Sequence, residues 1–452
     1  MESVKEQSLV TLVNNDPGKQ KRKYGRTWRQ RHRQKSDETK SYEMDSSSML
    51  VSLSQWLKQK GMRRHLGSRL KVAVFSDTGR GLMAVNGVRA GEVVVSIPRQ
   101  ALITCEDVVH DDHLGAVLRS SGKKLKAMEV LTLFLVYHKS LDEASSWRPY
   151  LESLPKSYTV PLYCSKSEHA LFPAFLKAFA DQQEEDINAC YINIREIISQ
   201  TLGGDSICID DVKWAWFTVN TRAVYLKNES PDPILVDDDK CALAPYLDLL
   251  NHTPNAQVTT GLNQKNNCYE IVTQVSYKPF EQVFINYGPH DNIKLYKEYG
   301  FTVPNNPHNS VPVTLDDIKR VAKSVCSDDQ RISDMYNKCK LLKKHQLDEG
   351  LVVSNDGPSW ALEVATTILL MTAAELTRWQ VVYHDYQGVQ HRKLVLGVLN
   401  HVIECKLQEL HERLEEMDSV ENCTEAFMVG RNLVRECCEF LREAVPGVGK
   451  AV

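Results

Sequence analysis

The sequence has no stretch of apolar residues long enough to cross a membrane. A membrane-spanning helix needs about 20 predominantly apolar residues, and the densest apolar cluster of this 452-residue chain, "ILLM" at 368–371, lies among Thr and Glu residues. The opening "MESVKEQSLV" also lacks the apolar core of a secretory signal peptide. We therefore expect an intracellular protein without membrane contact.

Cysteine pairs with metal-ligand spacing are missing as well. The 12 cysteines include no Cys-x-x-Cys pair, and only Cys437 and Cys438 are adjacent. This pattern argues against a zinc cluster or a disulfide framework and is typical of buried thiols in a reducing compartment. The segment "HDDH" at 110–113 has metal-like residue types, but nothing downstream completes a site, so we interpret it as a solvated loop. We expect no bound metal.

Charge is nearly balanced overall but unevenly distributed. The 55 Lys and Arg and the 58 Asp and Glu give a formal net charge of −3, yet nine of the 17 residues at 19–35, "KQKRKYGRTWRQRHRQK", are Lys or Arg. Residues 1–46 have little to bury, so we expect a disordered basic arm. It is either a solvated tail or a nuclear localisation signal with loose contact to nucleic acid or histones in chromatin. We expect a cytoplasmic and nuclear protein. A nucleic-acid-binding function ranks low, because Tyr24 and Trp28 are the only aromatic residues beside the basic charges.

Local patterns divide the rest of the chain into helical and β-rich stretches. Helical periodicity begins at 48–61, with Gly61 as a C-terminal cap. Short β-type runs follow at 70–103, and the turn "DTGRG" separates the first two, which predicts a compact antiparallel unit. Residues 112–215 are mostly helical, and β-type runs return at 241–287. We expect the second β block to complete the sheet begun by the first, with the helices as an insertion.

The last third of the chain is helical almost to its end. This predicts a separate helical domain at 305–452, after a β-rich domain with its insertion at 47–304. In "NDGPSW" we expect Asp356 to cap a helix and Pro358 to lie in its first turn. An apolar stripe with helical spacing, more typical of a core than of a partner site, is formed by Leu399, Ile403, Leu407, Leu410, Leu414 and Met417.

Four segments with candidate functional residues lie in or beside the β-rich part. "DTGRGLMA" puts Gly79 and Gly81 around Arg80, which permits close backbone approach to a ligand, although no phosphate-binding helix follows. "TVNTRAVY" puts Arg222 in an apolar helical setting, where a guanidinium needs a carboxylate partner. "PYLDLLNH", and then "FINYGPHDN" with "EYGF", supply further polar and aromatic residues. Taken singly, each segment also has a structural explanation, such as a buried ion pair or a hydrogen-bonded Asn or Tyr.

In this order the segments resemble a SET-domain methyltransferase of the Rubisco-methyltransferase-like class. The resemblance covers about residues 48–450 and rests on "GRGLMA", "SSWRPYLESLP", "VNTRAVY", "APYLDLLNH" and "NYGPHDN" with "EYGF". It implies an α+β fold, with a pseudoknotted SET β-sheet core, a helical insert at about 112–215 and an all-α C-terminal substrate-binding domain. The pseudoknot comes from the resemblance alone, because general rules of chain threading disfavour it. The chain lacks the cysteine-rich flanks of zinc-dependent histone methyltransferases.

The resemblance also implies S-adenosylmethionine as methyl donor and assigns residues to its site. The cofactor-binding residues would be Arg80, Gly81, Leu82, Arg222, Asn251, His252, Tyr287 and Phe301. Among them, Arg222 would pair with the donor's carboxylate, the corner made by Asn251 and His252 would anchor its amino group and adenine, and Tyr287 would be the catalytic tyrosine. The acceptor channel would be lined by Asp248, Tyr269, Tyr299 and Val224.

The implied reaction is N-methylation of a lysine in a protein or peptide, with histones and non-histone proteins both open as substrates. An aromatic channel would desolvate the lysine ammonium and lower its pKa, and Tyr287 would orient the free amine. The same fold could instead methylate histidine, but Val224 and Leu247 offer no polar partner for an imidazole, so lysine is favoured. A non-enzymatic peptide-binding adaptor is a third interpretation, opposed by the presence of Arg222 and Tyr287. We expect a monomer.

One departure from the family pattern concerns a turn. A glycine that is usual before the last strand is absent, since the chain reads "YKPFEQVFINY" there. We expect this to affect the turn more than the site, and the enzyme to be active.

Overall fold

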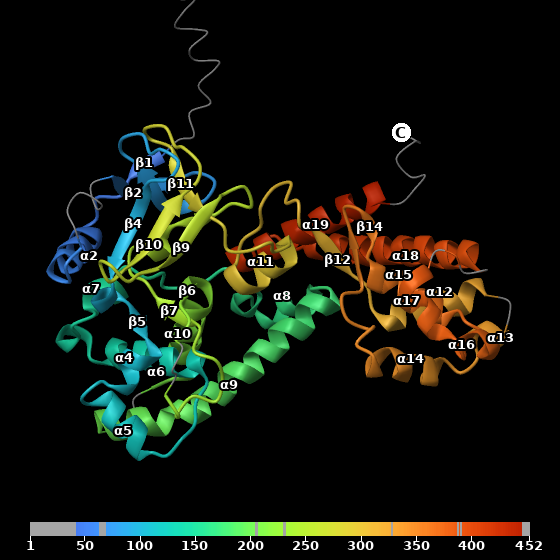
Figure 1. The fold of residues 1–452 in the computed structure, drawn as a ribbon, viewed down its shortest axis with the longest axis horizontal. Helices are drawn as coiled ribbons and strands as arrows, with labels where there is room; N and C mark the ends of the chain where they lie inside the picture. The colour runs from blue at the N-terminus through green and yellow to red at the C-terminus, as the bar shows by residue number, and fades with distance from the viewer. Residues whose placement is uncertain are drawn as a thin grey trace, which may run out of the picture.

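The computed structural model describes residues 42–62, 69–203, 207–228, 232–326, 329–386, 388 and 391–444. Figure 1 shows a β-rich lobe with helices beside it and a helical lobe built from the last third of the chain. Each lobe has its own core of buried apolar side chains. The long helix α9 (Ala174–Leu202) contributes to both, because Leu176 lies in the core of the helical lobe and Ile194 in that of the β-rich lobe.

The central sheet joins the two β blocks, as the sequence predicts. Its strands are, in order across the sheet, β1 (Tyr42–Met44), β2 (Leu70–Phe75), β3 (Gly79–Ala84), β11 (Gln282–Ile285) and β8 (Asn251–His252). β2 and β3 form the antiparallel hairpin expected around "DTGRG". β11, from the second block, pairs antiparallel with β3 and parallel with β8. The second block therefore completes the sheet that the first begins.

The four N-terminal β runs do not form one compact unit, which corrects that expectation. Two other sheets contain β4 (Val93–Pro98), β10 (Cys268–Thr273) and β9 (Val258–Asn263), and β5 (Ile103–Thr104), β7 (Cys241–Leu243) and β6 (Ala223–Tyr225). β4 pairs with β10 and β5 pairs with β7, both antiparallel. Alternation of apolar residues marks a strand but leaves its distant partner open, so only the β2–β3 hairpin was predictable.

The end of the predicted disordered arm is ordered, which is a second correction. The arm up to residue 41 lies outside the described residues, but Tyr42–Met44 form β1 and pair antiparallel with β2. All three side chains of β1 are exposed, so the strand has no apolar alternation to reveal it. Backbone hydrogen bonds to the free edge of β2 hold it instead.

The turn with the missing glycine keeps a glycine-like backbone. Phe280 has φ +70°, in the left-handed region that non-glycine residues rarely adopt. Its exposed ring stacks on Tyr42 of β1, with the ring centroids 6.2 Å apart and the planes inclined by 10°. The departure is therefore confined to the turn, and part of the conformational cost is offset by a contact with the first strand.

The region at 112–215 is helical as predicted. The helix α2 (Ser48–Gln59) lies between β1 and β2 in the chain, and Gly61 follows it with φ +87°. The helices between the two β blocks are α4 (Cys105–Val109), α5 (Leu114–Ser120), α6 (Ala127–Ser140), α7 (Arg148–Leu151), α8 (Lys166–Leu171), α9 and α10 (Ile209–Arg222). In "HDDH", Asp111 Oδ1 accepts hydrogen bonds from the N–H groups of His113 and Leu114, which start α5.

The helical lobe contains a small sheet that the sequence patterns did not predict. Its helices are α11 (Asn292–Tyr299), α12 (Leu315–Val325), α13 (Asp329–Ile332), α14 (Met335–Lys344), α15 (Trp360–Leu369), α16 (Ala373–Leu376), α17 (Val382–Asp385), α18 (Arg392–Asp418) and α19 (Glu425–Ala444). The strands are β12 (Ser310–Pro312), β13 (Val352–Ser354) and β14 (Gly357–Pro358). The lobe is thus mainly helical rather than all-α.

The cap of α15 is also different from the prediction. Pro358 belongs to β14, and the N-cap is Ser359, whose hydroxyl accepts a hydrogen bond from Leu362 N–H at 3.1 Å. Asp356 lies in the turn between β13 and β14, three residues before the N-cap. The predicted stripe on α18 is buried in the helical lobe, except that Leu407 is half-buried.

All 12 cysteines are free, and five of them are buried, whereas Cys208 is exposed. Within the described ranges, no cluster of three or more His, Cys, Asp or Glu side chains is placed to hold a metal ion. In the same part of the chain, no helix combines the length and apolar character needed to span a bilayer.

Candidate active site

Three strands of the central sheet bring distant motifs together. β11 lies between β3 and β8, so that Val283 pairs with Leu82 on one side and Phe284 with Asn251 on the other. Because β8 is parallel to β11, Asn251 and His252 run alongside the strand that leads to Tyr287. The sheet therefore places the Arg80 turn, the Asn–His pair and the tyrosine around one end of three adjacent strands.

Asn251 ties this group to the turn before β3. Its side-chain amide donates hydrogen bonds to the backbone carbonyls of Arg80 at 3.1 Å and Thr78 at 3.3 Å. Gly81 follows, where an added Cβ would lie 2.9 Å from the Asn251 amide nitrogen and would also clash with the amide of Gln282. A side chain at residue 81 would therefore displace these two amides, and glycine leaves room for the Asn251 hydrogen bonds to Arg80 and Thr78.

The His252 ring is a positioning group for the backbone of Tyr287. Its Nδ1 accepts a hydrogen bond from Tyr287 N–H at 3.0 Å, so the neutral ring carries its hydrogen on Nε2. Burial, with the nearby His290 and His308 rings, lowers the pKa of His252 to about 4. Within the part of the chain that the structure describes, the Nε2 atom is buried without a hydrogen-bond partner. The family resemblance implies that the corner made by Asn251 and His252 anchors the donor, and the His252 side chain adds this bond to Tyr287.

Tyr287 is held by both its backbone and its hydroxyl. The hydroxyl donates a hydrogen bond to the carbonyl of Leu250 at 2.8 Å, directly before the Asn–His pair. Its ring lies 5.0 Å from that of Tyr299 and 5.1 Å from that of His252, measured between centroids. Burial raises the pKa of Tyr287, although the charge of Arg222 opposes this. Tyr287 is therefore a neutral phenol at physiological pH.

Arg222 finds its carboxylate partner within the chain. It ends α10, and its Nη1 donates hydrogen bonds to the Asp248 backbone carbonyl at 3.0 Å and to Asp248 Oδ2 at 3.3 Å. The hydroxyl of Tyr150 donates to the same Oδ2 at 3.0 Å. Burial opposes the positive charge of Arg222, but Asp248 and neighbouring tyrosine hydroxyls outweigh it and raise the pKa of Arg222. The guanidinium is charged and fixed.

Asp248 is presented by a strained bend. Tyr246, two residues earlier, has φ 74° and ψ −41°, a conformation that is rare for a bulky residue. Its hydroxyl donates a hydrogen bond to the Leu70 carbonyl at 3.1 Å, which anchors the bend to β2. The short turn that follows, Leu247–Leu249, carries the Asp248 side chain, only 3% exposed, toward Arg222.

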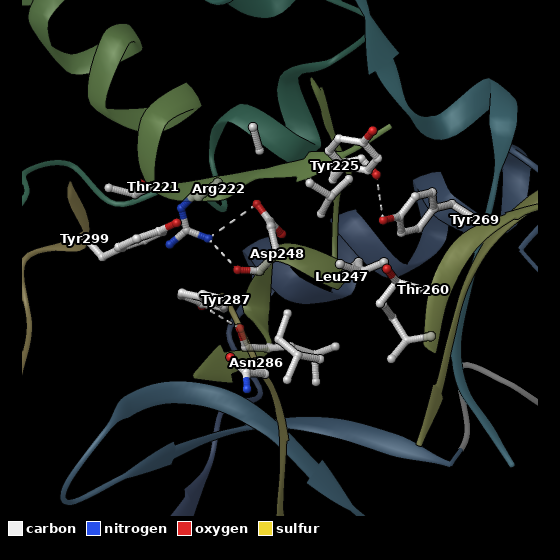
Figure 2. Close-up of a pocket in the computed structure, with 15 residues that line it drawn as sticks. Thr221, Arg222, Tyr225, Leu247, Asp248, Thr260, Tyr269, Asn286, Tyr287 and Tyr299 are labelled. Atoms are coloured by element: carbon white, nitrogen blue, oxygen red, sulfur yellow. Dashed lines mark hydrogen bonds and ion pairs between the residues drawn. The ribbon is translucent and has the colours of Figure 1, made fainter. Parts of the chain in front are cut away.

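A pocket of about 180 Å³ opens beside Arg222 and Tyr287. Figure 2 shows the Arg222–Asp248 pair on one wall, Tyr287 and Tyr299 beside it, and Tyr269 opposite. Tyr269 is held by a hydrogen bond of 3.0 Å from its hydroxyl to the Tyr225 carbonyl. Six of the residues assigned from the sequence line this pocket: Arg222, Val224, Asp248, Tyr269, Tyr287 and Tyr299.

The other assigned residues lie on the strand side of Tyr287. Leu82, on β3, is fully buried, while Arg80 and Gly81 precede it in the same strand. Phe301 follows α11, and its ring centroid lies 6.1 Å from that of His252 and 6.2 Å from that of Tyr287. The structure thus places the pocket on one side of Tyr287. The start of β3 at Arg80, the Asn251–His252 pair and the Phe301 ring lie on the other side.

Sequence reasoning missed the short segment that supports both arginines. Tyr150, on α7, donates to the carboxylate that holds Arg222, and the backbone carbonyl of Ser153 accepts a hydrogen bond from Arg80 Nη1 at 3.3 Å. Both residues belong to "SSWRPYLESLP", a motif of the family resemblance to which no site residue was assigned. The many aromatic and polar residues of this stretch, within an otherwise helical region, could have marked it as functional. They did not show which residues they contact.

Comparison with known proteins agrees with this geometry. The family model described as SET domain matches residues 79–288. SET domain-containing protein 4 of Homo sapiens is 34% identical over 419 residues, which cover 91% of this chain and 93% of that protein. This chain belongs to the SET-domain family. Its homology to SET domain-containing protein 4 extends through the helical lobe, because the aligned region reaches far beyond the SET domain itself.

Two further similarities bear on the SET domain. A solved structure described as the SET domain of LSMT bound to lysine and AdoHcy has a TM-score of 0.63 and 18% identity, and covers 89% of this chain and 91% of that one. This confirms the SET fold with its helical C-terminal region. Actin-histidine N-methyltransferase of Xenopus tropicalis is 30% identical over 58% of this chain, but this match covers only 45% of that protein.

Proposed function

We propose that this SET-domain protein transfers a methyl group from S-adenosylmethionine to the side-chain amine of a lysine in a protein substrate. The observation that carries the proposal is the position of Tyr287. This neutral phenol is fixed by the Leu250 carbonyl at 2.8 Å and stands between an aromatic pocket and the strand corner formed by Asn251 and His252.

S-adenosylmethionine supplies the electrophilic methyl group in this fold. The residues present fit it, because two buried nitrogen atoms at the site have no hydrogen-bond partner among the described residues: Arg222 Nε and His252 Nε2. Both carry a hydrogen in the protonation states described above, and such donors fit a ligand with carboxylate and heterocyclic acceptor atoms.

The pocket suits a long apolar side chain that ends in an amine. Its walls combine aliphatic residues such as Val224 and Leu247 with the rings of Tyr269 and Tyr299. A lysine amine has a pKa near 10.4 in water, and only the free amine is nucleophilic. Removal from water lowers that pKa. Asp248 offsets the charge of Arg222, so that the ammonium form is not repelled on entry.

Tyr287 orients the amine rather than deprotonating it. Because burial keeps its hydroxyl protonated, the phenol is no general base at neutral pH. Its donated hydrogen bond is used by Leu250, which leaves the phenolic oxygen free to accept a hydrogen bond from the amine. Fixed orientation of the two reactants is worth on the order of several kcal/mol of the barrier. The chain's contribution is thus positioning and exclusion of water.

Histidine methylation is the second candidate, because relatives named actin-histidine N-methyltransferase share the matched region. An imidazole needs a polar partner to hold its second nitrogen. Val224 and Leu247 line the pocket without offering one, and the carboxylate of Asp248 is engaged by Arg222 and Tyr150. This arrangement favours lysine.

Methyl transfer from labelled S-adenosylmethionine to purified histones and to cell extract tests the proposal, with amino-acid analysis of the labelled product. We expect label in methyl-lysine, and a loss of roughly a hundredfold in rate for Tyr287→Phe, because the amine is then misoriented toward the methyl group. Tyr336→Phe is the matched control, because it removes a hydroxyl from a side chain that is 77% exposed in the helical lobe. Label in methyl-histidine would select the second candidate. Peptide binding without stabilisation by S-adenosylmethionine would indicate an adaptor.

A further inference from the structure

The segment just before α2 reaches Arg80, the second residue of β3. Asp45 follows β1, and its Oδ2 accepts a hydrogen bond from Arg80 Nε at 3.1 Å. The exposed fractions of the two side chains are 12% for Asp45 and 35% for Arg80, so the pair is partly shielded from water. The two residues are 35 positions apart and lie on different segments of the chain.

We propose that Asp45 is a positioning residue for the methyl-donor site, acting through Arg80 to hold the turn that precedes β3. The inference rests on the proposed function, because this turn serves the donor only if the chain binds S-adenosylmethionine. It assigns a role to the end of the N-terminal segment, which lies outside the region matched by the SET-domain model at 79–288.

Besides the pairing of β3 with β2, three groups hold the start of β3 through Arg80, and Asp45 is one of them. Arg80 Nη1 donates to the Ser153 carbonyl at 3.3 Å, and the Arg80 carbonyl accepts from the Asn251 amide at 3.1 Å. Asp45 is the only charged partner among these three. Without it, the guanidinium would keep a single weak bond, and the backbone at Arg80 and Gly81 would be fixed from the strand side alone.

Asp45 is itself rigidly placed. Its backbone N–H donates to the Val72 carbonyl at 3.2 Å, and its Oδ1 accepts from Ser47 N–H at 3.1 Å. Burial alone would raise the pKa of Asp45, but the hydrogen bonds from Ser47 and the charge of Arg80 outweigh it and lower that pKa. The carboxylate is therefore charged at neutral pH. Because β1 is also held by its ladder with β2, removal of the charge leaves the segment in place.

The test measures binding of S-adenosylhomocysteine by calorimetry to the full chain and to variants. We expect Asp45→Asn to weaken binding about two- to fivefold, the range for a partly exposed ion pair. The KM for S-adenosylmethionine should rise by the same factor, with kcat at saturating donor unchanged. Glu43→Gln is the matched control, because it removes the same charge from an exposed side chain of β1, two residues earlier, and should bind as the wild type does.

A double-mutant cycle separates positioning from general destabilisation. If Asp45 acts through Arg80, Asp45→Asn has no further effect on affinity in an Arg80→Gln background. Equal weakening in both backgrounds, or wild-type affinity for Asp45→Asn, would overturn the inference. Failure of the wild-type protein to bind S-adenosylhomocysteine at all would overturn the proposed function instead, and the two failures are therefore distinguishable.

Discussion

The Arg222–Asp248 pair gives a sharp test of how the pocket wall is held together. Asp248→Asn keeps the size of the side chain and an oxygen that accepts from the Tyr150 hydroxyl, but it removes the negative charge. Arg222 is then left as a buried cation whose remaining bond of 3.0 Å goes to the backbone carbonyl of residue 248. Breaking a buried ion pair by removing one partner costs about 3–5 kcal/mol.

We expect a cost near the lower end, about 3 kcal/mol of unfolding free energy, for two structural reasons. The Arg222 side chain retains 17% exposure, so water partly solvates the uncompensated charge. The backbone carbonyl bond also survives the change. Asp248 itself is only 3% exposed, so we do not expect the cost in unfolding free energy to be lower still.

The measurement is urea unfolding at neutral pH, followed by tryptophan fluorescence, for the wild type, Asp248→Asn, Arg222→Gln and the double variant. In the Arg222→Gln background, the aspartate substitution should cost no more than about 1 kcal/mol, because no buried cation remains to be neutralised. An Asp248→Asn protein within about 1 kcal/mol of the wild type would refute the view that this pair is buried and charged. Equal costs in both backgrounds would refute the coupling.

Three further predictions follow from backbone strain and a buried titratable group. Phe280→Gly should be about 1 kcal/mol more stable than Phe280→Ala in thermal unfolding, since both lose the stack on Tyr42 but only glycine relieves φ +70°. Gly300→Ala should lower stability by about 1–3 kcal/mol and weaken S-adenosylhomocysteine binding, because its Cβ would lie 2.6 Å from Thr159 Oγ1 at φ +81°, just before Phe301. Folding lowers the pKa of His252 from 6.5 to about 4. The free energy of unfolding should therefore be highest above pH 6.5 and fall as the pH drops toward 4. Urea unfolding midpoints measured across this pH range should depend less on pH for His252→Gln than for the wild type.

Much of the fold was predictable because its signals are local. The β2–β3 hairpin follows from two apolar runs around a glycine turn, and the stripe on α18 follows from spacings of three and four residues. β1 was missed because its three side chains are exposed and carry no alternation. The cap of α15 was misplaced because Asp356 and Ser359 are both good capping residues, and only the pairing of Gly357–Pro358 into β14 decides between them.

The candidate site was likewise predictable only in part. Arg222 was expected to need a carboxylate, a requirement of its chemistry, but the sequence did not show that Asp248 supplies it. Tyr150, which donates to the same carboxylate, lies 98 positions from Asp248. Asp45 was assigned to a disordered arm, although it meets Arg80 in an ion pair. Each of these partners is set by packing between segments that are distant in the chain.

By itself, the sequence determined the order and type of most elements, the SET-domain family, and the motif residues Arg222, Asn251, His252 and Tyr287. Helical and strand periodicities, turn residues and short motifs are properties of neighbouring residues, so they are readable along the chain. The tertiary structure alone decided which strands pair, which carboxylate neutralises which arginine, and which nitrogen atoms are left for a ligand. Periodicity shows which face of an element is buried, but the identity of the group packed against it depends on contacts between distant segments, and these exist only in the folded chain.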